Sequence, residues 1–405
     1  MVVAAHEDLP DPAGSAESEG LVEAVPEDVR GRSVRTNAGS EHEGSVQRLG
    51  IAPRTGSPRE DDAVGREDGA REECGDEDRL AEGSHDVENA RRRPPIPPTL
   101  LAMARKVIAV IGGTGAQGGG VVDALLAGGD AKVRVLSRNP QSDASKALAA
   151  RGVEVVKGDL LEPSTLGKAL EGAEGAFLVT NFWDPTQQAK EHEVGVAAVK
   201  AARSAGVRHF VWSTLPDVER FTKGGLHVVH FTGKAKVDAA VTAAGFERYT
   251  FVEAPMYFQN FLTMMGPQPL PGGGRGWAVP MDPAKRCIHA GDVHEVGKAV
   301  AAAFRSTKEA CPNGTYVGVC GGTYSWNDFV ATLNDQGHQL SVAQVPPEVY
   351  DGFYPGAKEM REMFQWFEQQ TYFGPDHEKH IAAARALVPG GFTSFADWAK
   401  ANMKP

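Results

Sequence analysis

A glycine-dense segment, IGGTGAQG at residues 111–118, has the clearest chemical meaning in this chain. The apolar run at residues 107–111 precedes it and an apolar helical pattern follows it, so it joins a buried strand to a helix. A turn this tight needs backbone angles that glycine adopts easily, and the missing side chains let phosphates approach the backbone. The N–H groups and positive dipole end of the helix then face an anion. The segment predicts a site for a dinucleotide pyrophosphate; the alternative is an ordinary strand–helix turn.

The glycines of this segment fit two templates. One is GxGxxG, through Gly113, Gly115 and Gly118. The other is the GxxGxxG spacing of short-chain dehydrogenase-like proteins, in which Gly112 takes the first place.

The end of the second predicted strand indicates which dinucleotide is bound. An acidic residue about 20 positions after the glycines would bind a ribose 2′-hydroxyl and repel a 2′-phosphate. Here Arg138 stands 20 residues after Gly118, within Ser137-Arg138-Asn139-Pro140. Because a guanidinium suits a phosphate monoester, the sequence favours NADP(H) over NAD(H); a solvent-facing arginine is the alternative.

Polar residues also follow the third and fourth predicted strands. Asp159 could accept a hydrogen bond from the adenine amine, or it could only form the turn after Gly158. Thr180, Asn181 and Phe182 come where the chain must pass the ribose and nicotinamide, although they could only cap a loop.

The candidate catalytic residues are Lys234 and His230, with Ser213 on the preceding strand. In short-chain dehydrogenases a tyrosine four residues before a lysine passes a proton as hydride moves, and the lysine lowers the tyrosine pKa. Here the tyrosine position holds His230. A histidine one turn from the lysine could exchange protons near neutral pH, or it could be a surface residue after a loop. Lys234 itself could be a solvated lysine.

The sequence predicts no metal site. His377 and His380 resemble a ligand pair but lack a third partner and the HExxH order. The four cysteines have no zinc-finger or CxxC spacing, so we interpret them as free thiols in a reducing compartment, the cytoplasm.

Strands and helices alternate around these residues. Apolar strands are predicted at 107–111, 132–137, 153–156, 176–180, 209–213 and 249–253, and helices at 144–151, 163–170, 190–205 and 233–244. This alternation is typical of an α/β fold with a doubly wound parallel sheet, the NAD(P)-binding Rossmann fold. After residue 254 prolines, glycines and aromatics indicate a smaller α+β lobe over the carboxyl edge of the sheet. We therefore expect a Rossmann domain at 103–255 and a C-terminal lobe at 256–405.

The first hundred residues are a different population. They contain no Phe, Trp, Tyr or Lys, and they carry the whole net charge of −11. Such a segment cannot bury enough apolar area to offset its chain entropy, so we predict that residues 1–102 are a disordered acidic extension. Met103 also resembles a natural start. The neutral remainder gives no reason to expect nucleic-acid or membrane binding, and no apolar run approaches a membrane span.

Several motifs together resemble the NmrA-like family of atypical short-chain dehydrogenases. They are GGTGAQGG at 112–119, KVRVLSRNP at 132–140, VTNFW at 179–183, HFTGK at 230–234, YFQN at 257–260 and YPGA at 354–357. The resemblance spans residues 105–398 and implies an NADP(H) site. The residues that it implies are Gly112, Gly113, Thr114, Gly115, Ala116, Gln117, Gly118, Arg138, Asn139, Pro140, Gln141, Ser142, Asp159, Leu160, Thr180, Asn181, Phe182, Lys234, Tyr257, Phe258, Gln259 and Asn260.

The chain departs from similar proteins at two places. Gln141 and Ser142 stand where basic residues recur, and Leu160 replaces a polar residue. Similar family members lack the catalytic tyrosine and sense the NADPH/NADP⁺ ratio through conformation, dimerisation and partner binding. The resemblance therefore implies a redox sensor with weak or no dehydrogenase activity, acting through a protein partner or a homodimer. The alternative is an NADPH-dependent oxidoreductase of the isoflavone or quinone reductase kind that uses Lys234.

Overall fold

A computed structural model of the chain describes residues 106–270 and 272–405. The predicted disordered extension, residues 1–102, and the alternative start at Met103 lie outside the described residues.

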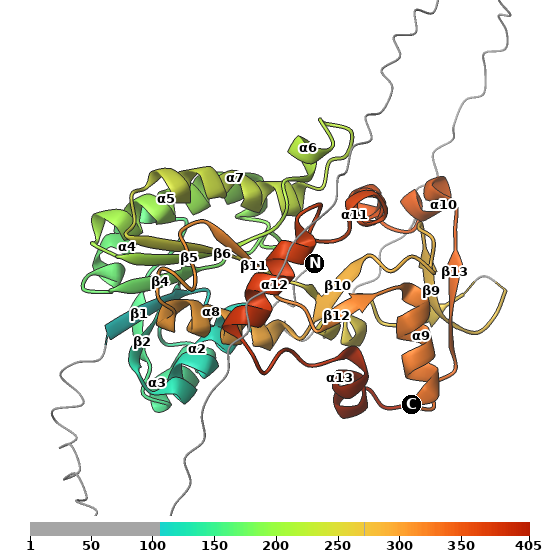
Figure 1. The fold of residues 1–405 in the computed structure, drawn as a ribbon, viewed down its shortest axis with the longest axis horizontal. Coiled ribbons are helices and arrows are strands. Elements are labelled where there is room, and N and C mark those ends of the chain that lie inside the picture. Colours follow the sequence, from blue (N-terminus) through green and yellow to red (C-terminus); the bar gives the residue numbers. More distant parts are fainter. Residues whose placement is uncertain (1–105, 271) are drawn as a thin grey trace, which may run out of the picture. The chain divides into compact units, whose positions relative to one another are not determined.

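A seven-stranded parallel sheet is the central element of the described chain (Figure 1). The strand order is β11-β6-β5-β4-β1-β2-β3, and the order reverses between β1 and β4. The strands are β1 (Lys106–Ile111), β2 (Ala131–Ser137), β3 (Glu154–Lys157), β4 (Gly175–Leu178), β5 (His209–Thr214), β6 (Arg248–Glu253) and β11 (Thr315–Gly318). The predicted doubly wound Rossmann sheet is confirmed.

Helices cover both faces of this sheet, so its strands are apolar on both sides. Alternate residues of β1 pack into two separate clusters, Ile108 and Val110 into one and Ala109 and Ile111 into the other. The first cluster includes helices α2 (Ala116–Gly128), α3 (Asp143–Ala150), α8 (Val296–Arg305) and α12 (His377–Leu387). The second includes α4 (Pro163–Leu170), α5 (Glu191–Ser204) and α7 (Val229–Ala243).

Helices α2 and α8 approach each other through glycine. A Cβ on Gly297 would lie 2.0 Å from the carbonyl oxygen of Gly120, and one on Gly120 would lie 2.3 Å from that of His294. Only glycine allows α2 to approach α8 and the segment just before it this closely.

The chain returns to the sheet after leaving it. Strand β11 and helices α8 and α12 all lie beyond residue 256, yet β11 pairs with β6 along its length, from Thr315 beside Thr250 to Gly318 beside Glu253. The C-terminal 150 residues therefore supply part of the Rossmann unit as well as the second lobe.

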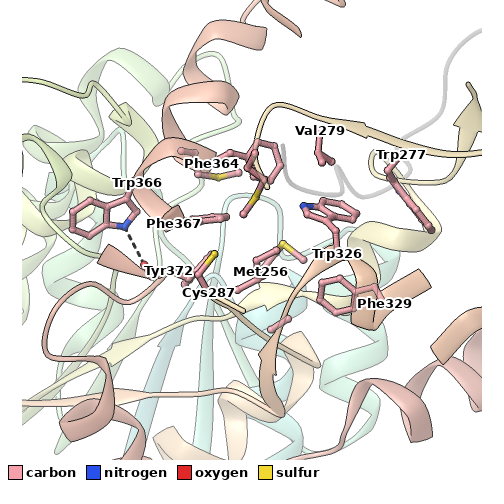
Figure 2. Packing of buried hydrophobic residues seen from close by; sticks show 14 of the residues in the cluster. Met256, Trp277, Val279, Cys287, Trp326, Phe329, Phe364, Trp366, Phe367 and Tyr372 are labelled. Atoms are coloured by element: carbon pink, nitrogen blue, oxygen red, sulfur yellow. Dashed lines mark hydrogen bonds between the residues drawn. The ribbon is translucent and has the colours of Figure 1, made fainter. Parts of the chain in front are cut away.

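The second lobe has an aromatic core of its own (Figure 2). Trp326, Phe329 and Trp366 are among its fully buried side chains, and the indole of Trp366 donates to the carbonyl of Tyr372 at 3.2 Å. Two small sheets, β12-β10-β7 and β13-β9-β8, lie in this lobe. The elements are β7 (Met256–Tyr257), β8 (Gln268–Pro269), β9 (Arg275–Val279), β10 (Ile288–Gly291), β12 (Gly322–Tyr324), β13 (Leu340–Gln344), α6 (Val218–Phe221), α9 (Trp326–Asp335), α10 (Pro347–Asp351), α11 (Ala357–Gln370) and α13 (Phe395–Asn402). The prediction of a smaller lobe of mixed helices and strands is confirmed.

Candidate dinucleotide site

The glycine turn between β1 and α2 has the geometry that its sequence predicts. Gly112 adopts a positive φ of 86°, and Gly115 is the extended residue that precedes α2. A Cβ on Gly118 would lie 2.1 Å from the carbonyl oxygen of Gly112, so the helix can start this close to the strand only with glycine there. Gly112, Gly115 and Gly118 thus have the separate roles of the GxxGxxG spacing. Gly113 is also closed to a side chain, because its Cβ would lie 2.6 Å from Val135.

The start of α2 is suited to an anion. No side chain caps its first turn and no acidic residue lies there, so its first N–H groups and its dipole are not neutralised by the chain. Thr114, Gly115 and Ala116 are exposed at this point. The turn opens between the carboxyl ends of β1 and β4, where the strand order reverses and ligands of doubly wound sheets bind. A pyrophosphate fits the residues that this chain provides.

Gln117 connects the glycine turn to strand β5 and to the second lobe. Its carbonyl oxygen accepts a hydrogen bond from Ser213 Oγ on β5 at 2.8 Å, and its Nε2 donates to the hydroxyl of Tyr257 on β7 at 2.5 Å. Burial raises the pKa of Tyr257 to about 12, so this phenol keeps its proton. Ser213, Gln117 and Tyr257 therefore form one chain of hydrogen bonds from the sheet to the second lobe.

Arg138 follows β2 directly, and its side chain is 63% exposed. Its Nη1 donates to Asp184 Oδ2 at 3.0 Å, across 46 residues of sequence. Asp184 lies in the segment between β4 and α5 and is only 12% exposed. Hydrogen bonds from Thr186, and then the Arg138 guanidinium, hold the pKa of Asp184 below its usual value. Sequence reasoning missed Asp184, because only the fold brings it to Arg138.

The predicted site residues after Arg138 form hydrogen bonds within their own loop. Asn139 Oδ1 accepts from the N–H of Gln141 at 3.0 Å, and Ser142 caps α3 by accepting from Ser145 N at 3.3 Å. Pro140 lies between them and supplies no donor. Following β3, Asp159 Oδ1 accepts from the N–H of Leu161 at 2.9 Å, which is the turn-forming role that the sequence left open. Leu160 packs partly against the apolar cluster of α4 and α5.

Lys234 of α7 is buried beside Thr180, which follows β4. The ammonium donates to Glu191 Oε1 at 2.5 Å and to the carbonyl and the hydroxyl of Thr180, each at 3.0 Å. An ammonium has three donors, so all of them have acceptors in the protein. The Thr180 hydroxyl in turn donates to Glu191 Oε1 at 2.7 Å.

Glu191 is a candidate functional residue that sequence reasoning missed, because no motif surrounds it. It begins α5, where the helix dipole favours a carboxylate, and its side chain is 2% exposed. Its second oxygen, Oε2, has no hydrogen-bond partner among the described residues. A Cβ on Gly233 would lie 2.8 Å from this oxygen, which explains the glycine before Lys234. Lys234 is therefore the main compensation for this buried charge.

His230 does not lie on the surface after a loop. Helix α7 begins at Val229, four residues before the predicted start, so His230 is inside its first turn and buried. Glu359 of α11 accepts from both the backbone N–H of His230 at 3.1 Å and its ring Nδ1 at 2.7 Å. This carboxylate from the second lobe replaces the capping residue that α7 lacks in its own sequence.

The ring of His230 is held in an aromatic surrounding. Its centroid lies 5.3 Å from Trp183 and 5.8 Å from Phe182. Burial lowers the pKa of His230 despite the opposing effect of Glu359. Burial works to raise the pKa of Glu359, but the hydrogen bonds from His230 outweigh it and the net shift is downward. The pair is thus a neutral imidazole that donates to an ionised carboxylate.

The four predicted site residues after β6 are residues 257–260, and they do not all face the glycine turn. Phe258 is fully buried against Phe395 and Trp398, so its ring belongs to the second lobe. The amide of Gln259 donates to Asp292 at 2.7 Å and accepts from Val293 N at 3.1 Å. The backbone carbonyl of Asn260 accepts from Thr263 and Met265. Of these four residues, Tyr257 is the one whose side chain reaches the glycine turn.

The last predicted residues of the crevice follow β4. Asn181 is exposed, and its side chain accepts from the N–H of Trp183 at 3.2 Å. Phe182 is buried, with an edge contact to Trp183. Both lie in the same loop as Asp184. This loop therefore contacts Arg138 through Asp184 and His230 through Phe182 and Trp183.

A second group of titratable side chains lies one turn further along α7. Asp238 accepts from Trp212 at 3.0 Å, Thr214 at 2.8 Å and Tyr316 at 2.8 Å. Burial raises the pKa of Asp238 to about 7, and it also raises the pKa of Glu253, which pairs with His380 at 2.7 Å. Two of the three donors to Asp238 come from β5, so this group lies behind Lys234.

The described residues contain no cluster of three His, Cys, Asp or Glu side chains that could hold a metal ion. His380 is engaged with Glu253, and His377 with the carbonyl of Gly374. Within the same residues, no helix is long and apolar enough to span a membrane.

Comparison with known proteins decides the family. Residues 104–399 match the model of the NmrA-like family. The chain belongs to the NmrA-like family.

Two curated relatives illustrate the match. One is the NmrA-like family domain-containing oxidoreductase lnaB of Aspergillus flavus, 37% identical over 163 residues, which is 39% of this chain and 49% of the relative. The other is an NmrA-like family domain-containing protein of Dictyostelium discoideum, 33% identical over 213 residues, which is 50% of this chain and 68% of that protein. The aligned segment thus spans about half the length of the first relative.

Among solved structures, this chain resembles NmrA, a negative transcriptional regulator, in complex with NADP. The TM-score is 0.62 and the sequence identity 24%, over 73% of this chain and 95% of that one. A further crystal structure of NmrA holds NAD, with the same TM-score and coverage. These likenesses show the NmrA-type Rossmann fold of the chain.

Proposed function

We propose that this NmrA-like protein binds NADP(H) and acts as a sensor of its redox state, with little or no dehydrogenase turnover. The cofactor would lie along the crevice, with its pyrophosphate on the glycine turn at the start of α2 and its 2′-phosphate beside Arg138. That NmrA has been solved in complex with NADP and with NAD supports a dinucleotide as the ligand.

The observation that carries the sensor proposal is how the catalytic groups are held. A short-chain dehydrogenase needs its serine, proton donor and lysine to meet at one reacting carbonyl. Here Ser213 donates to Gln117, His230 to Glu359, and Lys234 to Thr180 and Glu191. Three candidate groups have three sets of partners, and the tyrosine is absent from its position. The glycine turn and Arg138 support binding of the dinucleotide, while the groups that would transfer a proton are engaged with separate partners.

A sensor also needs a route from the cofactor to another surface. Two carboxylates of α11 accept backbone N–H groups at the start of α7. Glu359 accepts from His230 at 3.1 Å, and Glu362 accepts from His227, just before the helix, at 2.6 Å. Movement of α7 at the nicotinamide end would therefore shift α11. We propose that α11 presents the response to a regulated protein or to a second copy of this chain.

The setting of this function is a reducing compartment, which we propose is the cytoplasm. Cys287, Cys311 and Cys320 are buried and free. Free thiols of this kind persist where glutathione and thioredoxin keep cysteines reduced.

The competing function is an NADPH-dependent reductase. The oxidoreductase names of lnaB and of several other fungal relatives favour it. In this case Lys234 would leave one acceptor and donate to a substrate carbonyl, because each of its N–H groups already has a partner.

Calorimetry and an oxidation assay separate the two. We expect NADPH to bind with micromolar affinity and more tightly than NADH, and NADPH oxidation with quinones and aldehydes to stay at the level of a protein-free blank. Absence of NADPH binding at millimolar concentration would reject the sensor proposal. Substrate-dependent oxidation that disappears in Lys234→Ala would establish the reductase instead.

A further inference from the structure

The pair between Arg138 and Asp184 joins the segment after β2 to the segment after β4. Arg138 lies at the predicted 2′-phosphate position, whereas Asp184 belongs to the loop that carries Phe182 and Trp183. Trp183 packs against His230 at 5.3 Å between ring centroids. One ion pair therefore connects the adenosine end to the aromatic surrounding of His230.

Asp184 is the fixed member of this pair. Its Oδ1 accepts from the N–H of Thr186 at 3.0 Å and from the hydroxyl of Thr186 at 2.6 Å. Its Oδ2 accepts from Gln187 Nε2 at 3.3 Å as well as from Arg138. The backbone carbonyl of Asp184 receives the N–H groups of Gln187 and Gln188. These bonds hold the carboxylate in place within its own loop, and Arg138 is its partner from another part of the described chain.

A 2′-phosphate would compete with Asp184 for this arginine. Both are anions, but a phosphate monoester carries more charge and binds a guanidinium through two oxygens. An ion pair with one member 63% exposed contributes little, so its exchange costs little. A carboxylate that stays beside the bound phosphate would also repel it.

We propose that Asp184 is a specificity-determining residue that exchanges with the 2′-phosphate of NADP(H) for Arg138. Asp184 holds Arg138 and the 181–187 loop in the arrangement described here. When the phosphate takes the guanidinium, the loop loses its anchor at the adenosine end, and Trp183 changes its packing against His230. The inference rests on the proposed NADP(H) binding and adds how the phosphorylated dinucleotide is distinguished from the unphosphorylated one.

The first test is the affinity of Asp184→Asn for the two reduced dinucleotides, by calorimetry. Asparagine keeps the acceptor oxygen for Thr186 but removes the charge. We expect NADPH to bind about fivefold more tightly and the affinity for NADH to be unchanged. A fivefold gain corresponds to the loss of a competing ion pair that contributes up to about 1 kcal/mol. Asp123→Asn is the control, because it removes an equal charge from the exposed side of α2.

The second test uses the wild-type chain and ligands that end before the nicotinamide. Adenosine 2′,5′-bisphosphate should change the tryptophan fluorescence, whereas adenosine 5′-monophosphate should not. The change should disappear in Trp183→Phe, because the other five tryptophans lie outside this loop.

These outcomes keep the inference distinct from the proposed function. If wild type binds NADPH but Asp184→Asn has the same or a lower NADPH affinity, the exchange is wrong while the function stands. If bound adenosine 2′,5′-bisphosphate leaves Trp183 emission unchanged, transmission through the loop is wrong. If NADPH does not bind wild type at all, the proposed function fails first.

Discussion

The candidate dinucleotide site contains two similar ion pairs in different surroundings. In the pair of Arg138 and Asp184 the arginine side chain is 63% exposed, although the carboxylate is 12% exposed. Lys234 and Glu191 meet in the interior, at 10% and 2% exposure. An exposed pair exchanges partners at little cost, whereas a buried pair must keep its partner or leave a charge without compensation. Exchange of partners therefore costs little at Arg138, whereas the pair of Lys234 and Glu191 keeps its arrangement.

The largest expected effect is at the buried pair. Glu191→Ala leaves the Lys234 ammonium buried without a counter-charge, and we expect the free energy of unfolding to fall by about 3–5 kcal/mol. Arg138→Ala breaks the exposed pair and should cost less than about 1 kcal/mol. Urea unfolding of both variants measures the contrast, with Glu193→Ala, exposed on the same helix, as the control. Equal losses in the two pairs would contradict the distinction.

A substitution in the glycine turn tests whether its close backbone contacts are needed for stability and for binding. The Cβ of Gly118→Ala would lie 2.1 Å from a backbone oxygen, so we expect a stability loss of about 1–3 kcal/mol. NADPH affinity measured by calorimetry should fall by at least about tenfold, an amount equal to 1.4 kcal/mol. Gly119→Ala is the matched control, since its nearest neighbour would be 3.9 Å away. If both variants bound NADPH normally, the turn would not hold the pyrophosphate.

A charge reversal at Arg138 sharpens the exposed end. Arg138→Asp places a carboxylate at the expected 2′-phosphate position, and we expect NADPH to bind roughly ten- to hundredfold more weakly, the loss of a charge-assisted contact. NADH should bind at least as well as before, so the preference reverses. Arg138→Gln separates loss of the cation from gain of the anion. Unchanged NADPH affinity in Arg138→Asp would show that another residue receives the phosphate.

The smallest expected effect concerns pH at the buried end. Burial raises the pKa of Asp238 from 3.8 to about 7, so the folded protein holds this proton more tightly than the unfolded chain. The stability it contributes is complete below pH of about 4 and is lost as the pH rises through about 7. Because solvent reaches part of the side chain, we expect a loss of about 2 kcal/mol or less relative to Asp238→Asn.

Denaturant unfolding at pH 4.5 and 7.5 measures this difference. Asp238→Asn keeps the acceptor for Trp212 and Thr214 and should be less sensitive to pH than wild type. Asp335→Asn, exposed on α9, should follow the wild-type dependence. A wild-type curve parallel to that of Asp238→Asn would show that Asp238 does not titrate in this window.

Features encoded by neighbouring residues were predictable from the sequence. The glycine turn depends on spacing within seven residues, and its φ and close contacts agree with the expected roles. The six predicted strands lie within two residues of the observed ones, because fully buried parallel strands are uninterrupted apolar runs. Helix α4 has the predicted bounds, since Pro163 marks its start and Gly172 follows its end.

Features that depend on distant residues were not predictable. Strand β11 has four residues, and its register beside β6 is set by the fold. The early start of α7 depends on Glu359, which lies 129 residues away from His230. Lys234 could be singled out from its spacing, but its partner Glu191 opens a different helix with no motif around it. Where a side chain finds its partner across the molecule, one sequence carries no local signal.

The return of the chain to form β11 has a consequence for how the molecule comes apart. A fragment that ends at residue 255 would contain the whole glycine turn, yet β6 would become an open edge with free backbone groups, prone to pair with other chains. The face now covered by α8 and α12 would also be bare. We therefore expect that residues 106–255 do not fold without the rest of the chain. The two halves should unfold in a single cooperative transition, and bound cofactor should raise its melting temperature.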